Sequence, residues 1–269
     1  MSLTLDSRQR AMLKEMGVKV WSRVVPVQAP GERAARTVRT TPTADTSAMV
    51  VQPRVAGAET MDWAALQQAV ADCRACALCN GRKHTVFGMG GLEPPNAGRP
   101  PVANWLIVGE APGDQEDLSG LPFVGPAGQL LDSMLKAMGL DRKRGAAVGD
   151  GQAAQGSYIA NVLKCRPPSN RNPEGEEVAQ CAPYLRRQIE LLQPRIILAM
   201  GRFAAQALLH DSVPDVHSLP LGKLRGQVHS YRGIPVVVTY HPAYLLRALG
   251  DKAKAWADLC LAMQRFSDP

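Results

Sequence analysis

The stretch WLIVGEAPGDQEDLSGLPFVGPAGQLL, residues 105–131, joins a short apolar segment to a helical pattern through a loop rich in glycine and proline. Its first five residues are typical of a strand that is buried on both faces of a sheet. A helix is expected to begin at Pro126 and Ala127, because proline favours the first helical turn. The loop between them carries four carboxylates and one aromatic residue, Phe123. The stretch therefore predicts a strand–loop–helix unit with an unusually polar loop.

Three further apolar segments rich in strand-forming residues follow along the chain: SYIAN (157–161), RIILAM (195–200) and PVVVTY (235–240). Helical patterns surround them at 62–72, at 130–139 and at 185–192, where Pro183 is expected to mark a helix start or a kink. Apolar strands that alternate with helices indicate an α/β protein. We expect three layers, α/β/α, around a central, mainly parallel four-stranded sheet.

Amino-acid composition and hydrophobic periodicity divide the chain into three parts. Residues 1–23 contain a short helical pattern, and residues 24–60 have the Ala-, Pro- and Thr-rich composition of a disordered linker. Residues 61–269 form the expected globular domain, within which residues 141–156 are predicted to be an exposed loop. The N-terminal helix is a candidate docking element for an unidentified protein partner.

Charge and hydropathy limit the classes of protein to consider. The chain has 31 Lys and Arg against 24 Asp and Glu, a net charge of +7, and this balance suits a polyanionic partner such as nucleic acid. It has no run of eighteen apolar residues, and its first residues lack the apolar core of a signal peptide. These features predict a cytoplasmic protein that does not bind membranes.

Six cysteines in a reducing compartment favour metal binding or reactivity over disulfides. The candidate metal ligands are Cys73, Cys76, Cys165 and Cys181. Four cysteines fit a tetrahedral zinc ion as well as an iron–sulfur cluster, and their spacing does not decide between the two. Cys79 is a near neighbour of the first pair, and Cys260 lies in a helical pattern where a buried apolar cysteine is expected.

Polar residues stand directly after three of the predicted strands: Glu110, Asn161 and His241. The carboxyl ends of parallel strands meet at one edge of a sheet, so these side chains are expected to line a single crevice. The sequence contains no phosphate-binding loop and no nucleophile elbow. Together these groups suit a flipped-out pyrimidine. The amide can read the polar edge of a heterocycle, a phenyl ring can stack on its face, and the imidazole can donate to a developing anion.

Three segments resemble a known family: GEAPGDQEDLSGLPFVGPAGQLLDSML (109–135), NVLKCRPPSNRNP (161–173) and HPAYLLR (241–247). They look like the motifs of the family 4 uracil-DNA glycosylases, the iron–sulfur-containing bacterial and archaeal type, and the resemblance covers about residues 63–260. It implies a uracil-DNA glycosylase-like fold and a monofunctional hydrolase. Such an enzyme acts as a monomer on uracil-containing DNA and leaves an abasic site for base excision repair.

The resemblance also implies roles for individual residues. Glu110 and the turn Ala111, Pro112 and Gly113 would surround the sugar and uracil. Phe123 would stack on the uracil, Asn161 would read its polar edge, and His241 would donate a hydrogen bond to its O2. The loop residues Leu245, Leu246 and Arg247 would press into the duplex. Cys73, Cys76, Cys165 and Cys181 match the ligands of a structural [4Fe–4S] cluster.

The group that positions the attacking water is left open. Other uracil-excising families place an aspartate after the residue equivalent to Glu110, whereas this chain has Ala111, so Glu110 and Glu116 are both candidates. Asp114 and Asp117 are expected to be solvated loop charges. The candidate phosphate contacts are Lys164, Arg166, Arg171, Lys223, Arg225 and Arg247.

Three alternatives belong to other functional classes. One is a uracil-binding relative that traps the abasic sugar covalently, but such proteins carry a histidine in a basic insert after the NxVK motif, and RPPSNRNPEGEE (166–177) has none. A second is a DNA-binding module without activity, which retention of Phe123, Asn161 and His241 argues against. A third is a generic nucleotide-binding protein, for which the chain lacks a phosphate motif.

Overall fold

The computed structural model describes residues 57–91, 103–142 and 156–268, and its centre is a six-stranded sheet of order β1-β3-β2-β4-β6-β5. The strands are β1 (Met89–Gly90), β2 (Trp105–Gly109), β3 (Ser157–Asn161), β4 (Ile196–Met200), β5 (Val228–Tyr231) and β6 (Ile234–Thr239). The four strands predicted from the sequence are the four parallel ones. The prediction missed β1 and β5, which pair antiparallel at the two edges. β1 has two residues, and in β5 only Tyr231 is buried, so neither has the apolar pattern of a buried strand.

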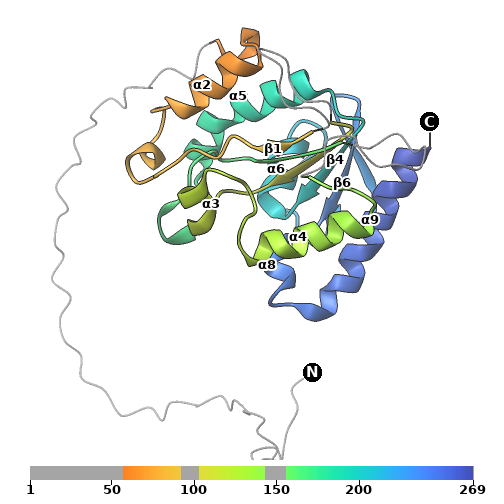
Figure 1. Ribbon diagram of the computed structural model, residues 1–269. Coiled ribbons are helices and arrows are strands. Elements are labelled where there is room, and N and C mark those ends of the chain that lie inside the picture. The colour runs from red at the N-terminus through yellow and green to blue at the C-terminus, as the bar shows by residue number, and fades with distance from the viewer. Residues whose placement is uncertain (1–56, 92–102, 143–155, 269) are drawn as a thin grey trace, which may run out of the picture. The chain divides into compact units, whose positions relative to one another are not determined.

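Alternate side chains of each central strand enter two separate hydrophobic cores. Leu106 and Val108 of β2 belong to the first core, whereas Trp105 and Ile107 belong to the second. The first core is covered by α2 (Trp63–Ala71), α5 (Gly175–Leu192) and α6 (Arg202–Leu209), and the second by α4 (Pro126–Ala137) and α9 (Lys252–Ser267) (Figure 1). The expected three-layer α/β/α arrangement is therefore confirmed.

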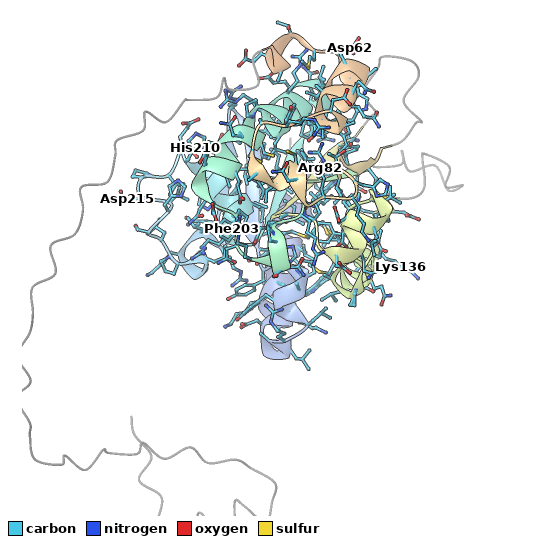
Figure 2. All side chains as sticks on the ribbon, turned by 90° about the vertical axis from the view of Figure 1, so that its left-hand side faces the viewer. Asp62, Arg82, Lys136, Phe203, His210 and Asp215 are labelled. Atoms are coloured by element: carbon cyan, nitrogen blue, oxygen red, sulfur yellow. The ribbon has the colours of Figure 1, made fainter. Side chains whose placement is uncertain are left out.

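The perpendicular view labels one residue from each helical layer. Lys136 of α4 and His210, at the end of α6, lie on opposite sides of the molecule (Figure 2). The shorter elements are α3 (Asp114–Ser119), α7 (Leu221–Leu224), α8 (Pro242–Leu245) and the 3-10 helices η1 (Ala58–Thr60), η2 (Ala77–Asn80), η3 (Pro168–Asn170) and η4 (Leu249–Asp251). Helices α3 and α8 follow directly after β2 and β6, so the chain reverses at the carboxyl edge of the sheet in both places.

A helix start at Pro183 is wrong, because α5 begins eight residues earlier and includes the proline, whereas the alternative of a kink there stays a prediction. The carboxylate of Glu177 accepts a hydrogen bond from the backbone N–H of Glu174 at 2.9 Å and so caps the true start. Pro183 removes one backbone hydrogen bond, but Tyr184 and Ile189, which follow it in α5, are buried in the first core. Packing against the first core outweighs this local loss.

Cys260 was predicted to be buried and is exposed. The buried stripe of α9 runs through Ala255, Leu259, Ala262 and Phe266, at helical spacing. Cys260 follows Leu259 by one residue, so it points about 100° away from that stripe.

Some domain boundaries differ from the sequence pattern, and others lie outside the described residues. Ala58, which we assigned to the linker, is buried in the first core, so packing extends at least to η1. Arg142, which we assigned to an exposed loop, is buried as well. The N-terminal helix, residues 24–56 of the linker and residues 143–155 lie outside the described part of the chain. Within that part, no helix is long and apolar enough to span a membrane.

Candidate active site

A cavity of about 670 Å³ opens at the carboxyl edge of the parallel strands. The register brings Gly109 of β2 opposite Asn161 of β3, and Met200 of β4 opposite Thr239 of β6. The segments that follow these strands therefore converge on one place, as the sequence predicted. The predicted site residues that line the cavity are Glu110, Ala111, Pro112, Gly113, Glu116, Phe123, Asn161, His241 and Arg247.

Phe123 lies in the cavity wall with a backbone φ of 54°, in the left-handed region that non-glycine residues rarely adopt. Such a conformation costs on the order of 1–3 kcal/mol and persists only where the surroundings impose it. Here the guanidinium of Arg142 donates to the carbonyls of Pro122 at 2.9 Å and Phe123 at 2.7 Å. Arg142 is held in turn by the carboxylate of Asp132 in α4, at 2.7 Å. This buried arginine, which the sequence analysis did not single out, fixes the backbone that carries the ring.

Asn161 is 1% exposed, and its side-chain oxygen Oδ1 has no hydrogen-bond partner within the described part of the chain. A side chain at Gly109 would collide with this oxygen and with the Phe123 ring, so glycine is required there for all three to meet. The backbone carbonyl of Asn161 accepts a hydrogen bond from the Lys164 ammonium at 2.8 Å. A buried amide whose acceptor is unused is poised for a ligand that offers an N–H.

His241 precedes α8, and its Nδ1 accepts the backbone N–H of Ala243 at 3.2 Å. Burial, together with the positive charge of Arg247, lowers the pKa of His241 to about 4. The ring is therefore neutral at physiological pH and carries its proton on Nε2. The imidazole lies beside the Phe123 ring, with centroids 5.4 Å apart and planes at 29°. His241 thus presents a hydrogen-bond donor next to a flat apolar surface.

Glu110 follows β2 and lies partly buried in the cavity wall. Burial raises the pKa of its carboxyl group, and the positive charge of Arg202 acts in the opposite direction. A partly desolvated carboxylate that faces a cavity is a suitable hydrogen-bond acceptor for a water molecule.

Glu116 has a different environment, which argues against a direct role with water. One carboxylate oxygen accepts the backbone N–H of Val124 at 2.8 Å and of Gly125 at 3.2 Å, and the other accepts that of Gly113 at 3.1 Å. Both oxygens are therefore engaged in holding the loop on either side of Phe123. Of the two candidates that the sequence left open, the structure favours Glu110.

Replacement of the two glutamates should separate these roles. Glu116→Ala should lower the free energy of unfolding by roughly 1–3 kcal/mol, because three backbone donors lose their acceptor. Glu110→Gln should leave the unfolding midpoint unchanged or higher, since it removes a desolvated charge, while any reaction in the cavity slows. Thermal unfolding and activity measured on both variants check this. If Glu116→Ala loses activity while its free energy of unfolding is unchanged, Glu116 acts directly in the reaction.

Asp117 was expected to be a solvated charge and is 3% exposed. Its two oxygens accept the backbone N–H of Lys83 at 3.0 and 3.1 Å, so it ties α3 to the segment that follows η2. Asp114 is exposed and pairs with Arg166 at 2.6 Å.

The HPAYLLR loop is only partly exposed. Leu245 was expected to contact DNA, but it is 1% exposed, in the helix α8 that packs against α4. Leu246 is 42% exposed, and Arg247 is exposed and lines the cavity. The structure thus leaves Leu246 and Arg247 as the contacts that this loop can make with a large ligand.

The predicted phosphate contacts also divide by exposure. Lys164 is 1% exposed and donates to Asn161 and Gln188, and Arg225 is largely buried against Asp258, so neither can reach a phosphate. Arg166 and Arg171 are engaged by Asp114 and by Glu177, whereas Lys223 and Arg247 are exposed.

The structure adds Arg202, which is exposed at the start of α6 and lines the cavity beside Glu110. Its position directly after a parallel strand was the signal available in the sequence.

The four predicted metal ligands line a second, small cavity together with Cys79, Arg82 and Lys164. They come from three distant segments: the loop before η2, the loop after β3, and α5. Within the described residues, no group of three His, Cys, Asp or Glu side chains is close enough together to hold a single metal ion. The thiols thus surround a common space without converging on one point. The guanidinium of Arg82, labelled in Figure 2, lies 3.1 Å from the sulfur of Cys165.

The two sites are neighbours in the fold. Lys164 lies against the cysteine cavity and donates to the backbone of Asn161 in the large cavity. Ala111, in the wall of the large cavity, packs against the cluster formed by Leu78, Leu163 and the two buried cysteines. An ordered cysteine site therefore supports the wall that carries Asn161.

The parallel sheet, the cavity at its carboxyl edge and the three motifs around it define a class of protein. A sequence profile described as the uracil DNA glycosylase superfamily matches residues 95–260, so the chain belongs to that superfamily. Within the superfamily it resembles type-4 uracil-DNA glycosylases from three organisms. The chain is 38% identical to that of Pyrobaculum aerophilum over 78% of this chain and 99% of that protein. It is 39% identical to that of Archaeoglobus fulgidus over 66% and 79%, and 37% identical to that of Thermotoga maritima over 68% and 82%.

Proposed function

We propose that this chain excises uracil from DNA: it binds a uracil nucleotide that has left the base stack and hydrolyses its N-glycosidic bond. The observation that carries the proposal is the meeting of Phe123, Asn161 and a neutral His241 in one cavity. These three groups suit the flat face, the polar edge and the O2 atom of a pyrimidine. The likeness to proteins named type-4 uracil-DNA glycosylases supports uracil as the base.

The chemistry follows from the charge that develops as the bond breaks. When the bond between N1 and C1′ lengthens, uracil gains negative charge and the sugar becomes an oxocarbenium-like cation. The Nε2–H of His241 stabilises the charge on O2, and a donor of this kind is worth about 3 kcal/mol, or a hundredfold in rate. The oxygen of a water held by Glu110 then bonds to C1′, and the proton that it loses passes to the Glu110 carboxylate and from there to solvent. Solvent protonates the uracil anion, and an abasic site remains.

An oligonucleotide with a single uracil tests this proposal directly. Incubation with the protein and then with alkali should cleave the strand at the uracil position, because an abasic site is labile to base. An intact strand would refute the proposal. A species that resists alkali and migrates with the protein would instead indicate the covalent-trapping alternative. The monomeric state and the cytoplasmic location remain predictions from the sequence.

The cysteine site suits a [4Fe–4S] cluster held by Cys73, Cys76, Cys165 and Cys181. Four thiols around a common space fit a group larger than one ion, and the guanidinium of Arg82 beside them favours a net negative occupant. A cluster bound there would tie three distant segments together, which is a structural role. The segments so tied include the one that carries Asn161.

The cluster is tested by colour and metal content. The purified protein should be brown, with broad visible absorbance and four irons per chain, and Cys165→Ser should lose both. Cys260→Ser is the matched control, because Cys260 is exposed on α9. Cys79→Ser should also retain the iron, and a loss equal to that of Cys165→Ser would make Cys79 a ligand. A colourless protein that contains zinc would overturn the assignment.

A further inference from the structure

An aromatic stack borders the large cavity, and the proposed reaction assigns it no role. Tyr240 follows β6 and Tyr244 lies in α8, with ring centroids 4.9 Å apart and planes at 30°. The guanidinium of Arg225 lies 4.1 Å from the centre of the Tyr240 ring. Both tyrosines line the cavity, as does His241, which lies between them in the sequence.

Both ends of this stack are anchored in the protein. Arg225 donates to the carboxylate of Asp258 at 2.8 Å and to the backbone carbonyl of Lys254 at 2.7 Å. The hydroxyl of Tyr244 donates to Asp251 at 2.6 Å, and Asp251 is paired with Lys254 at 2.8 Å. The orientation of the Tyr244 ring is therefore set before any ligand arrives. A ring that is already ordered loses little conformational entropy when something stacks on it.

Despite these anchors, Tyr244 is 39% exposed. It belongs to a larger group of exposed apolar side chains in residues 118–124 and 244–249, two segments that also contribute to the cavity wall. Those on the Phe123 side are Leu118, Leu121 and Val124, and those on the His241 side are Tyr244, Leu246 and Leu249. Among the described residues, only two other large apolar side chains are exposed, Val228 and Trp256. Of the six in these two segments, Tyr244 is the one that lines the cavity, so its ring is the exposed apolar surface that a ligand held there would meet.

The size of the cavity also points to more than one base. Its volume of about 670 Å³ lies in the middle of the range of roughly 300–1,000 Å³ that holds drug-sized ligands. A single pyrimidine is much smaller than such ligands. When uracil leaves the stack, the base next to it on the same strand loses one stacking neighbour, so an aromatic face at the cavity mouth can replace that contact.

From these observations we infer that Tyr244 is a stacking site for the nucleobase adjacent to the flipped uracil on the same strand. Leu246 and Arg247 follow on the same loop, beside this base and its phosphate. The site accepts any base, because every base has an aromatic face. This inference rests on the proposed excision of uracil from DNA, and it adds a second base-binding position to the first.

The test compares two ligands with and without the tyrosine. Both are single-stranded oligonucleotides with a tetrahydrofuran abasic analogue at the uracil position, and in the second the two flanking nucleotides also lack bases. The wild-type protein should bind the first about tenfold more tightly than the second. Tyr244→Ala should bind both with the weaker affinity, and Tyr244→Phe should restore the preference because the ring remains. Comparison of both proteins on both oligonucleotides isolates the contribution of contact between the tyrosine ring and the neighbouring base.

Two outcomes would overturn the inference. If Tyr244→Ala weakens binding of both ligands equally, the ring only supports the His241 loop. If it weakens neither, the ring is not in contact with DNA. A 2-aminopurine placed on one side or the other of the analogue gives an independent measurement, since its fluorescence should rise in Tyr244→Ala at one of the two positions. Uracil release by the wild-type protein is measured separately, so failure of the proposed excision is distinguished from failure of the stacking site.

Discussion

His241→Ala should lower the rate of uracil excision by about 10²–10³-fold while binding to abasic DNA is retained. The reason is that the Nε2–H donor acts on charge that exists only as the bond breaks, so its loss affects the transition state more than the bound product. Single-turnover excision and equilibrium binding to a tetrahydrofuran oligonucleotide provide the two measurements. His210→Ala is the matched control, because His210 is an exposed histidine outside the cavity.

The pH dependence follows from the same environment. The pKa of His241 is lowered to about 4, so the ring keeps its neutral form, with the proton on Nε2, through the range where an ordinary histidine titrates. The excision rate should therefore show no step near pH 6.5. A decline on the acid side should instead follow protonation of Glu110, whose pKa is raised by burial, and Glu110→Gln should remove that decline. A step near pH 6.5 that disappears in His241→Ala would show that the imidazole titrates normally.

Asn161→Ala should reduce excision at least as strongly, by about 10²-fold or more in kcat/KM, and leave the stability of the protein nearly unchanged. A site built to hydrogen-bond its substrate discriminates strongly through that bond, so removal of the amide eliminates recognition of the polar edge. The folded protein loses little, because Oδ1 of Asn161 has no internal partner among the described residues, and Lys164 holds the backbone rather than the side chain. The cavity left by the smaller side chain is offset by relief of a buried, unsatisfied acceptor.

Chemical denaturation and excision kinetics, both measured on Asn161→Ala, test whether activity is lost while stability is retained. Asn172→Ala is the matched control, since Asn172 is an exposed asparagine that lines the same cavity. A large loss of stability in Asn161→Ala would mean that the amide is a structural residue. Normal excision in a stable Asn161→Ala protein would show that the pyrimidine is read by another group.

Lys164 illustrates why burial could not be predicted for individual charges. In the sequence it stands in a basic segment next to Arg166, which made a phosphate contact plausible. In the fold it is enclosed between the cysteine site and β3, where its ammonium satisfies a backbone carbonyl and Gln188. Arg225 was misassigned for the same reason, because its partner Asp258 is 33 residues away in the chain. Both partners are fixed by packing that involves distant segments.

The acidic loop after β2 shows the same limit. Its strand, its helix and the presence of Phe123 could all be read locally, because hydrophobic period and turn residues are properties of short segments. The roles of its carboxylates could not. Glu116 binds the loop itself, Asp117 binds the segment after η2, and only Glu110 faces the cavity with a free carboxylate among the described contacts. The high number of carboxylates in this loop therefore serves the structure of the loop as much as any reaction.

The sequence alone determined the α/β class, the four parallel strands and the gathering of Glu110, Asn161 and His241 at one edge. These follow from local hydrophobic patterns and from the rule that parallel strands end on the same side. Only the tertiary structure decided that Arg142 holds Phe123 in a strained conformation, that Leu245 is buried while Leu246 is exposed, and that Tyr244 stands anchored and exposed beside the cavity. Each of these depends on specific side-chain contacts, from the seven residues that separate Tyr244 from Asp251 to the nineteen between Phe123 and Arg142, and such contacts leave no period in the sequence.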